Sequence, residues 1–282
     1  MLLTRACRFV DRHFGVTRSF NGKRLRLPTP TRVHFSYFSD CHYEREEWKS
    51  TKCCRPGDTA VDVGANIGVI SAFLADAVSA TGCVYALEPN PSVFSLLTET
   101  ISMNSYGNVI PLQVAAGSAL AVSDFYIEEW GAFQPCSSLA PKTGTARAQK
   151  VIQAPLDFLL AGVSRIDYIK LDVEGAELNV LRGAVDLIEK HRPLIQVEVH
   201  GMYMPSFGDS VADLFAFLCA REYSALNLVD DTIVDVTQFE KDTKLHVATP
   251  YNGSDGATQG YGQLLFFNSD RSYISKLFPC AH

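Results

Sequence analysis

The sequence predicts a doubly wound α/β fold, in which helices cover both faces of a mostly parallel sheet. From residue 59 onward, short apolar runs alternate with segments of helical periodicity. The apolar runs are continuous, as in strands that are buried on both faces. Units of strand, helix and strand form right-handed crossovers, and these place successive strands in one parallel sheet.

Seven strands are expected from these runs. They span residues 59–63, 83–87, 109–115, 166–171, 193–199, 223–229 and 263–267. Helices are expected over residues 67–79, 91–101, 178–188 and 211–219. The second helix has a clear start, because Asn90 is a favoured N-cap residue and Pro91 suits the first helical position.

Three segments depart from this alternation. Residues 1–42 are expected to form an N-terminal accessory segment, with a hairpin whose turn is Asn21-Gly22. Residues 43–282 form the main domain, which begins with a charged stretch of helical spacing over 43–52. Residues 117–155 are polar with period-two stretches, which indicates an inserted hairpin or lid beside the sheet. The polar, glycine-rich residues 240–262 are expected to form a surface loop.

Composition excludes several classes of protein. The 282 residues carry 25 Lys and Arg against 31 Asp and Glu, a net charge of −6, so neither nucleic acid nor an anionic membrane is an expected partner. No uncharged apolar stretch reaches the roughly 18 residues of a membrane helix, and no signal peptide is recognisable. The eight cysteines are scattered without a CxxC pair, which favours reduced thiols in a cytoplasmic protein. The oligomeric state is left open.

The first chemical signal is the turn Val61-Asp62-Val63-Gly64-Ala65-Asn66-Ile67-Gly68. Glycines allow a tight turn and close approach of a ligand, and the following helix N-terminus is expected to add unpaired N–H groups. The dinucleotide fingerprint fails, because its third and sixth positions are Asn66 and Val69. The spacing suits a ligand without a pyrophosphate that carries a charged amino-acid end, such as S-adenosylmethionine. A valine at Gly64 is expected to block that ligand and leave folding intact.

The second signal is Glu88, at the end of the second expected strand. A carboxylate there can accept hydrogen bonds from both hydroxyls of a ribose, as in other doubly wound nucleotide sites. The alternative is structural, since Asp62 and Glu88 can also serve only to cap neighbouring helices.

Further polar residues follow the next two strands. Asp172 ends the run Tyr168–Leu171, and Glu198 and His200 are two residues apart, so they share one face if the strand continues. We expect a neutral imidazole at His200 to take a proton from an acceptor hydroxyl, with Glu198 or Asp172 orienting it or balancing its charge. The alternatives are that Asp172 only anchors the next helix and that His200 is an ordinary surface residue. Glu174 and Glu177 remain open, because the helix dipole favours acids there anyway.

Together these stretches resemble the FkbM family of S-adenosylmethionine-dependent methyltransferases. The resemblance is carried by 62–68 (DVGANIG), 88–89 (EP), 169–177 (IKLDVEGAE), 181–184 (LRGA) and 198–200 (EVH). It implies a class I, Rossmann-like methyltransferase fold, with a seven-stranded sheet whose last strand is antiparallel. It also implies O-methylation, commonly of sugar or natural-product hydroxyls. The site it implies is Asp62, Gly64, Ala65, Asn66, Gly68 and Glu88 for S-adenosylmethionine, and Asp172, Glu198 and His200 for the acceptor. Ser137-Ser138 in the insertion also resembles a family feature.

The leading hypothesis is therefore an O-methyltransferase that acts on a small molecule or sugar and needs no metal. A second version places a divalent metal on Asp172, Glu174 and Glu198, because clustered carboxylates suit hard cations. A module that binds S-adenosylmethionine without catalysis is a different class. A nucleotide-dependent oxidoreductase is a third, which the broken dinucleotide spacing disfavours.

Overall fold

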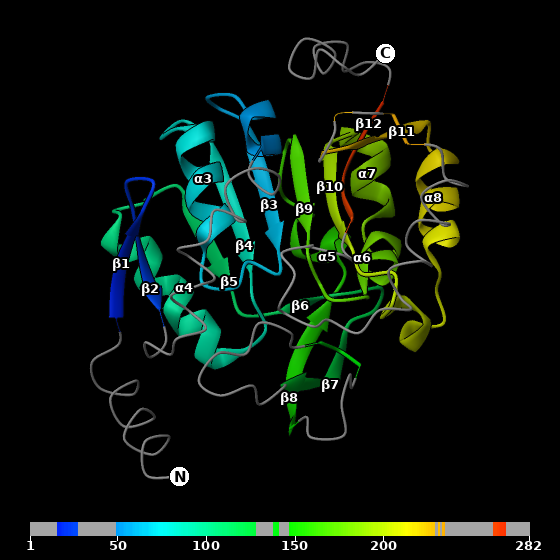
Figure 1. The fold of residues 1–282 in the computed structure, drawn as a ribbon, viewed down its shortest axis with the longest axis horizontal. Coiled ribbons are helices and arrows are strands. Elements are labelled where there is room, and N and C mark those ends of the chain that lie inside the picture. Colours follow the sequence, from blue (N-terminus) through cyan, green and yellow to red (C-terminus); the bar gives the residue numbers. More distant parts are fainter. Residues whose placement is uncertain are drawn as a thin grey trace, which may run out of the picture.

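A seven-stranded sheet forms the centre of the protein (Figure 1). This computed structural model describes residues 16–27, 49–127, 138–140, 147–228, 231, 233–234 and 262–268. From edge to edge the strands are β11 (Tyr223–Asn227), β12 (Gly262–Asn268), β10 (Leu194–Val199), β9 (Tyr168–Leu171), β3 (Thr59–Val63), β4 (Cys83–Leu87) and β5 (Val109–Leu112). Strand β12 is antiparallel to both neighbours, while β10, β9, β3, β4 and β5 are parallel. The predicted fold class is confirmed.

Each face of the sheet has its own hydrophobic layer, because successive side chains of a strand point to opposite faces. Val61 and Val63 of β3 pack into one layer, which includes residues of α5 (Leu156–Leu159), α6 (Glu177–Arg182), α7 (Val185–His191) and α8 (Val211–Cys219). Ala60 of the same strand packs into the other layer, with residues of the 3-10 helix η2 (Lys49–Cys53), α3 (Val69–Val78) and α4 (Pro91–Met103). A further 3-10 helix, η3, spans Met204–Phe207.

Two expected elements differ from the structure, and one helix was not expected. The strand predicted over 109–115 ends at Leu112, since Ala115–Ala116 leaves the main sheet as strand β6 of a second sheet. The helix predicted over 178–188 is two helices, α6 and α7, separated at Gly183. A Cβ atom on Gly183 would come within 2.0 Å of the Gly117 carbonyl oxygen, so this close approach needs glycine. Helix α5 has only one turn and was not predicted.

The insertion contains the expected hairpin. Strands β7 (Ala121–Ile127) and β8 (Arg147–Ala154) are antiparallel, and β6 adds to β8 in parallel, so the three form a small sheet. In Figure 1 this sheet lies below the main sheet. Residues 128–137 and 141–146 lie outside the described part of the chain, so the extent of the insertion and its role as a lid remain predictions.

The N-terminal hairpin is also present. Strands β1 (Val16–Phe20) and β2 (Lys23–Leu27) are joined by Asn21 and Gly22, whose φ angles of 43° and 78° suit an Asn-Gly hairpin turn. The hairpin packs against α4, where the N–H of Arg26 donates to Thr100 Oγ1 at 3.1 Å. The predicted boundary between 1–42 and 43–282 stays a prediction. The expected helix 43–52 is described only from its η2 end, and the expected loop 240–262 lies outside the described residues up to its last position, Gly262.

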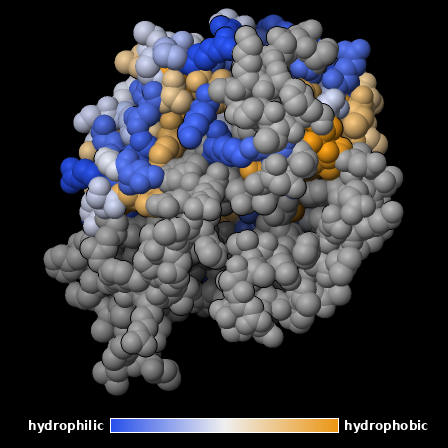
Figure 2. Space-filling model, turned by 45° about the horizontal axis from the view of Figure 1, so that its top comes forward, coloured by the Kyte–Doolittle hydropathy of each residue, from blue (hydrophilic) through white to orange (hydrophobic). Residues whose placement is uncertain are grey.

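The top of the molecule, as oriented in Figure 1, shows mostly hydrophilic side chains among the described residues (Figure 2). Smaller hydrophobic areas lie between them. None of the described helices is long and apolar enough to cross a membrane. Among the cysteines that the structure describes, Cys53, Cys54, Cys83 and Cys219 form no disulfide.

Candidate active site

The candidate site residues that the sequence analysis identified lie at one edge of the sheet. Gly64 follows β3, Glu88 follows β4, Asp172 follows β9 and His200 follows β10, and these four strands are adjacent and parallel. Their carboxyl ends therefore lie side by side, which is where open α/β sheets bind ligands.

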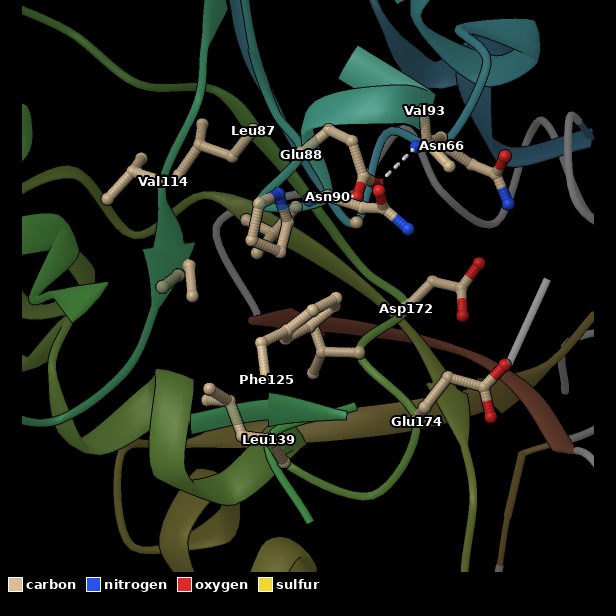
Figure 3. A pocket seen from close by; sticks show the side chains of 17 residues that line it. Asn66, Leu87, Glu88, Asn90, Val93, Val114, Phe125, Leu139, Asp172 and Glu174 are labelled. Atoms are coloured by element: carbon tan, nitrogen blue, oxygen red, sulfur yellow. Dashed lines mark hydrogen bonds between the residues drawn. The ribbon is translucent and has the colours of Figure 1, made fainter. Parts of the chain in front are cut away.

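A pocket opens at this edge (Figure 3). It holds about 650 Å³ of space, part of it open to solvent. Its lining comes from the ends of the main strands and from the small sheet. The residues are Val63, Gly64, Asn66, Leu87, Glu88, Pro89, Asn90, Val93, Val114, Ala115, Ala116, Phe125, Leu139, Asp172, Val173, Glu174 and Ala176.

Gly64 lines the pocket and is also required by the local backbone packing. Its φ is 80°, and a Cβ atom there would lie only 1.8 Å from the carbonyl oxygen of Asp172. The turn after β3 therefore touches the chain after β9 directly. The expectation that a valine at Gly64 leaves folding intact is wrong, because the side chain would collide with backbone before it reached a ligand.

The backbone N–H groups of the glycine turn are already engaged. Gly64 and Ala65 both donate to the Leu87 carbonyl, at 3.0 and 2.9 Å, and Gly68 donates to the Ala65 carbonyl at 2.9 Å. Asn66 N–H donates to Glu88 Oε2 at 3.0 Å, and Ile67 N–H donates to Asn66 Oδ1 at 2.8 Å. Every backbone N–H of the turn over residues 64–68 therefore has a partner, whereas the unpaired groups were expected at the N-terminus of the helix, which begins at Val69. A turn without free donors does not suit a pyrophosphate, whereas a positively charged ligand needs no donors.

Glu88 is buried at the pocket wall with both oxygens in use. Oε2 accepts from Asn66 N–H, and Oε1 accepts from Asn90 N–H at 2.8 Å. Each oxygen keeps a further lone pair, so two ligand hydroxyls can still be accepted. Burial raises the pKa of Glu88 to about 7, the two backbone N–H groups oppose this rise, and the charges of Asp172 and Asp62 add to it.

Three residues predicted to bind the cofactor do not line the pocket. Asp62 is wholly buried, where its Oδ2 accepts from Ser71 Oγ at 2.5 Å, and burial raises its pKa. Ala65 is part of the hydrophobic layer beneath the turn. A Cβ atom on Gly68 would lie 2.7 Å from Leu97 Cδ1, so Gly68 allows α4 to pack closely. These residues shape the turn, whereas Gly64, Asn66 and Glu88 reach the pocket.

A carboxylate–imidazole cluster, consisting of Asp172, Glu174, Glu198 and His200, lies next to the pocket. His200 is only 2% exposed, and its Nε2 lies 3.6 Å from carboxylate oxygens of Glu174 and Glu198 and 3.9 Å from Asp172. The prediction that Glu198 and His200 share a face is confirmed. Nδ1 pairs with Glu177 Oε1 at 2.7 Å, so Glu177 orients the ring. The expected balancing of its charge is confirmed for Glu198, which raises the pKa of His200.

The surroundings of His200 also change its expected charge. Burial lowers the pKa of His200, but Glu174, Glu177 and Glu198 together outweigh burial and raise it to about 10. His200 is therefore an imidazolium at neutral pH. The expectation that the His200 imidazole is largely neutral at neutral pH is therefore wrong, because three acids face the ring.

The sequence analysis gave Lys170 no role and left the role of Glu177 open. Lys170 is buried in β9, where its Nζ donates to Asp172 Oδ2 at 2.9 Å and lies 3.9 Å from Asp62 Oδ1. A lysine inside an apolar strand was a usable signal, because lysine is seldom buried without a partner. Glu177 had no such signal, since its contact with His200 joins residues 23 positions apart.

The small sheet contributes to the same site. Phe125 of β7 and Leu139 line the pocket. The buried Ser138 donates from its hydroxyl to the Glu174 carbonyl at 3.2 Å, which links the insertion to the chain after β9. Ser137, the other residue of the predicted pair, lies outside the described residues.

The strand order, the antiparallel β12 and the pocket at the carboxyl edge define a class I S-adenosylmethionine-dependent methyltransferase. Residues 62–225, more than half of the chain, match the family model described as "Methyltransferase FkbM domain". The chain belongs to this family, and it is an S-adenosylmethionine-dependent methyltransferase as the resemblance implied.

Individual relatives are more distant. The chain is 28% identical over 180 residues to the hexuronic acid methyltransferase AglP of Haloferax volcanii. The aligned region covers 63% of this chain and 70% of that protein. The structure of methyltransferase FkbM from Methylobacillus flagellatus superimposes with a TM-score of 0.49 at 17% sequence identity. The superposition covers 84% of this chain, and this chain spans about half (52%) of that protein's length. TYW2 of M. jannaschii, solved in complex with AdoMet, has a TM-score of 0.46 at 16% identity and covers 89% of this chain and 84% of that one.

Proposed function

We propose that this protein transfers the methyl group of S-adenosylmethionine to a hydroxyl oxygen of a sugar or similar small molecule. One observation carries the proposal: a single pocket is lined by Glu88 and by Asp172, each at the end of a different strand. Glu88 suits a ribose, and Asp172 suits the hydroxyl that gives up a proton. Asp172 and Glu174 lie on one side of the pocket and Glu88 on another in Figure 3.

The cofactor fits the Glu88 side of the pocket. Glu88 would accept hydrogen bonds from the two ribose hydroxyls through its remaining lone pairs. Leu87, Val93 and Val114 offer the apolar contacts that an adenine ring needs. Gly64 and Asn66 would lie against the rest of the cofactor. S-adenosylmethionine supplies an activated methyl group on a positively charged sulfonium, and the acids around the pocket suit that charge.

The acceptor side is formed by the carboxylate–imidazole cluster. Asp172 lines the pocket and is held in place by Lys170. Asp172 and Glu198 would take up the proton that leaves the acceptor hydroxyl. The imidazolium of His200 compensates their charge and fixes their positions. General-base assistance of this kind contributes roughly two to four orders of magnitude in rate.

The acceptor class is supported by a relative. The Haloferax volcanii protein is named as a hexuronic acid methyltransferase, so a sugar or sugar acid is the class that we propose here. The net charge of −6 does not favour nucleic acid as the acceptor.

The test is methyl transfer from radiolabelled S-adenosylmethionine to a panel of free sugars, hexuronic acids and short glycans, with products analysed by mass spectrometry. Asp172→Asn should lower the turnover by roughly 100-fold to 10,000-fold, while calorimetry shows unchanged affinity for S-adenosylhomocysteine. Asp186→Asn, at an exposed acid in α7, is the control and should keep full turnover. Binding of S-adenosylhomocysteine without transfer to any hydroxyl would favour the non-catalytic alternative and overturn the proposal.

A further inference from the structure

We propose that Asp172, Glu174 and His200 form a binding site for one divalent metal cation at the acceptor end of the pocket. One ligand atom from each residue lies within 4.8 Å of the others. The cation site adds detail to the proposed function, and its role in binding the acceptor depends on that function. It departs from the metal-free version that the sequence favoured. It also differs from the carboxylate-only alternative, because the structure supplies an imidazole as a ligand.

The spacing of the cluster suits a shared cation. His200 Nε2 is 3.6 Å from Glu174 Oε2 and 3.9 Å from Asp172 Oδ1, and both separations exceed a hydrogen bond. Ligand atoms bound to one cation at about 2.1 Å lie roughly 3 to 4 Å apart. The observed separations match those of ligand atoms that share one cation. Glu198 is 3.6 Å from the same nitrogen and can act beside the three ligands.

The buried histidine is a second, independent observation. His200 is 98% removed from solvent, yet its Nε2 is aimed at three carboxylates. Its Nδ1 is taken by Glu177, which is itself wholly buried. A carboxylate behind the ring is the arrangement that orients metal-binding histidines, because it fixes the tautomer whose Nε2 lone pair faces the metal.

The charge balance points the same way. Glu177 is a further acid, wholly buried behind the cluster, and its Oε2 has no hydrogen-bond partner within the described residues. Lys170 pairs with Asp172 on the side of Asp62. A divalent cation at Nε2 would replace the proton of the imidazolium, which is released to solvent. It would face the same carboxylates with one more positive charge than that proton.

A cation here would also define the acceptor. Two carboxylates and one imidazole suit Mn²⁺ or Mg²⁺, which keep further positions for oxygen ligands. Asp172 and Glu174 line the pocket, so those positions face it. The cation would bind a hydroxyl together with a neighbouring hydroxyl or carboxylate of a sugar, and Glu198 would receive the proton. It would also allow an acidic sugar to lie beside three carboxylates.

Mn²⁺ binding is the direct test, because free Mn²⁺ has an EPR signal that weakens on binding. The full chain, treated with chelator and then dialysed, should bind one Mn²⁺, and Mg²⁺ should compete for it. The double variant Asp172→Asn, Glu174→Gln should bind Mn²⁺ at least about 100-fold more weakly. The matched control, Asp186→Asn with Glu189→Gln, removes two exposed acids from α7 and should bind as the wild type does.

A second variant tests the role of the buried acid. Glu177→Gln should weaken Mn²⁺ binding by about 10-fold to 100-fold, since it changes only what lies behind His200. Each variant is also titrated with S-adenosylhomocysteine, which reports on the cofactor side and on folding. Wild-type protein that binds S-adenosylhomocysteine but no Mn²⁺ overturns the cation site and leaves the proposed function standing. Mn²⁺ binding that survives in the Asp172→Asn, Glu174→Gln variant also overturns the cation site. Wild-type protein that does not bind S-adenosylhomocysteine overturns the proposed function instead.

Discussion

Single residues at this site take their properties from their neighbours more than from their type. Glu88 and His200 are each buried at a strand end, yet the surroundings act on them differently. Burial dominates at Glu88 and raises the pKa of a carboxylate to about 7. At His200 burial lowers the pKa, and three acids reverse the effect and raise it to about 10. Sequence spacing placed both residues, but their charges depend on distances that only the folded chain defines.

The pKa of Glu88 predicts a pH-dependent affinity for S-adenosylhomocysteine. The ionised carboxylate is the form that accepts two ribose hydroxyls, and at pH 6 most of the free protein holds Glu88 protonated. Binding must then release a proton, so the affinity should rise about tenfold from pH 6 to pH 8 and level off above. Calorimetry in two buffers of different ionisation enthalpy measures both the affinity and the proton release.

Glu88→Gln is the control for this prediction. The amide does not titrate, so its affinity should be independent of pH over the same range. It should also bind about 10-fold to 100-fold more weakly at pH 8, since unpaired buried polar groups cost about 1–3 kcal/mol. A wild-type affinity that stays flat between pH 6 and pH 8 would exclude Glu88 as the titrating contact.

Gly64 is predicted to matter for stability before ligand binding. Gly64→Ala places a Cβ atom 1.8 Å from the Asp172 carbonyl oxygen at a φ of 80°, so the turn or the chain after β9 must move. We expect a loss of at least about 2 kcal/mol in unfolding free energy, measured by chemical denaturation. Gly162→Ala is the control, because nothing lies within 4 Å of the added atom, and it should change stability little. Equal stability of the two variants would disprove the steric argument.

At the scale of elements, the sequence was most informative about the central strands. Strands buried on both faces leave continuous apolar runs, and β3 and β4 have the predicted bounds. Elements fixed by contacts with distant chain were missed. Leu112 ends β5 because the next residues join another sheet, and Gly183 divides a helix because it touches Gly117. The site followed the same rule, since strand ends were predictable and the partner of His200 was not.

The small sheet gives a prediction of its own. Phe125 and Val122 lie on the same strand, β7, but Phe125 is buried at the pocket and Val122 is 69% exposed. Phe125→Ala removes an aromatic wall, and we expect about tenfold weaker binding of S-adenosylhomocysteine or of the acceptor. Val122→Thr keeps a β-branched residue on the outer face and should leave both unchanged. Calorimetry and acceptor KM measurements report the two effects, and wild-type values in Phe125→Ala would show that the small sheet only covers core.

The stability of the whole protein depends on whether the pocket is occupied, because loops that follow different strands form the pocket together. A ligand that binds only the folded chain stabilises it, by about 2.7 kcal/mol at 100 times its dissociation constant. S-adenosylhomocysteine should therefore raise the melting temperature, and NAD should not, since the turn over 64–68 has no free N–H for a pyrophosphate. A shift with NAD and none with S-adenosylhomocysteine would contradict the cofactor assignment.

The position of β12 has a consequence for how the protein is made. This strand, Gly262–Asn268, lies between β10 and β11, although both are complete in the chain by residue 227. Until the ribosome has released residue 268, the apolar edge of β10 has no hydrogen-bonding neighbour on that side. Unpaired strand edges recruit other chains. A nascent chain of this protein is therefore most exposed to misassociation late in synthesis, and chaperones that hold open sheet edges would act at that stage.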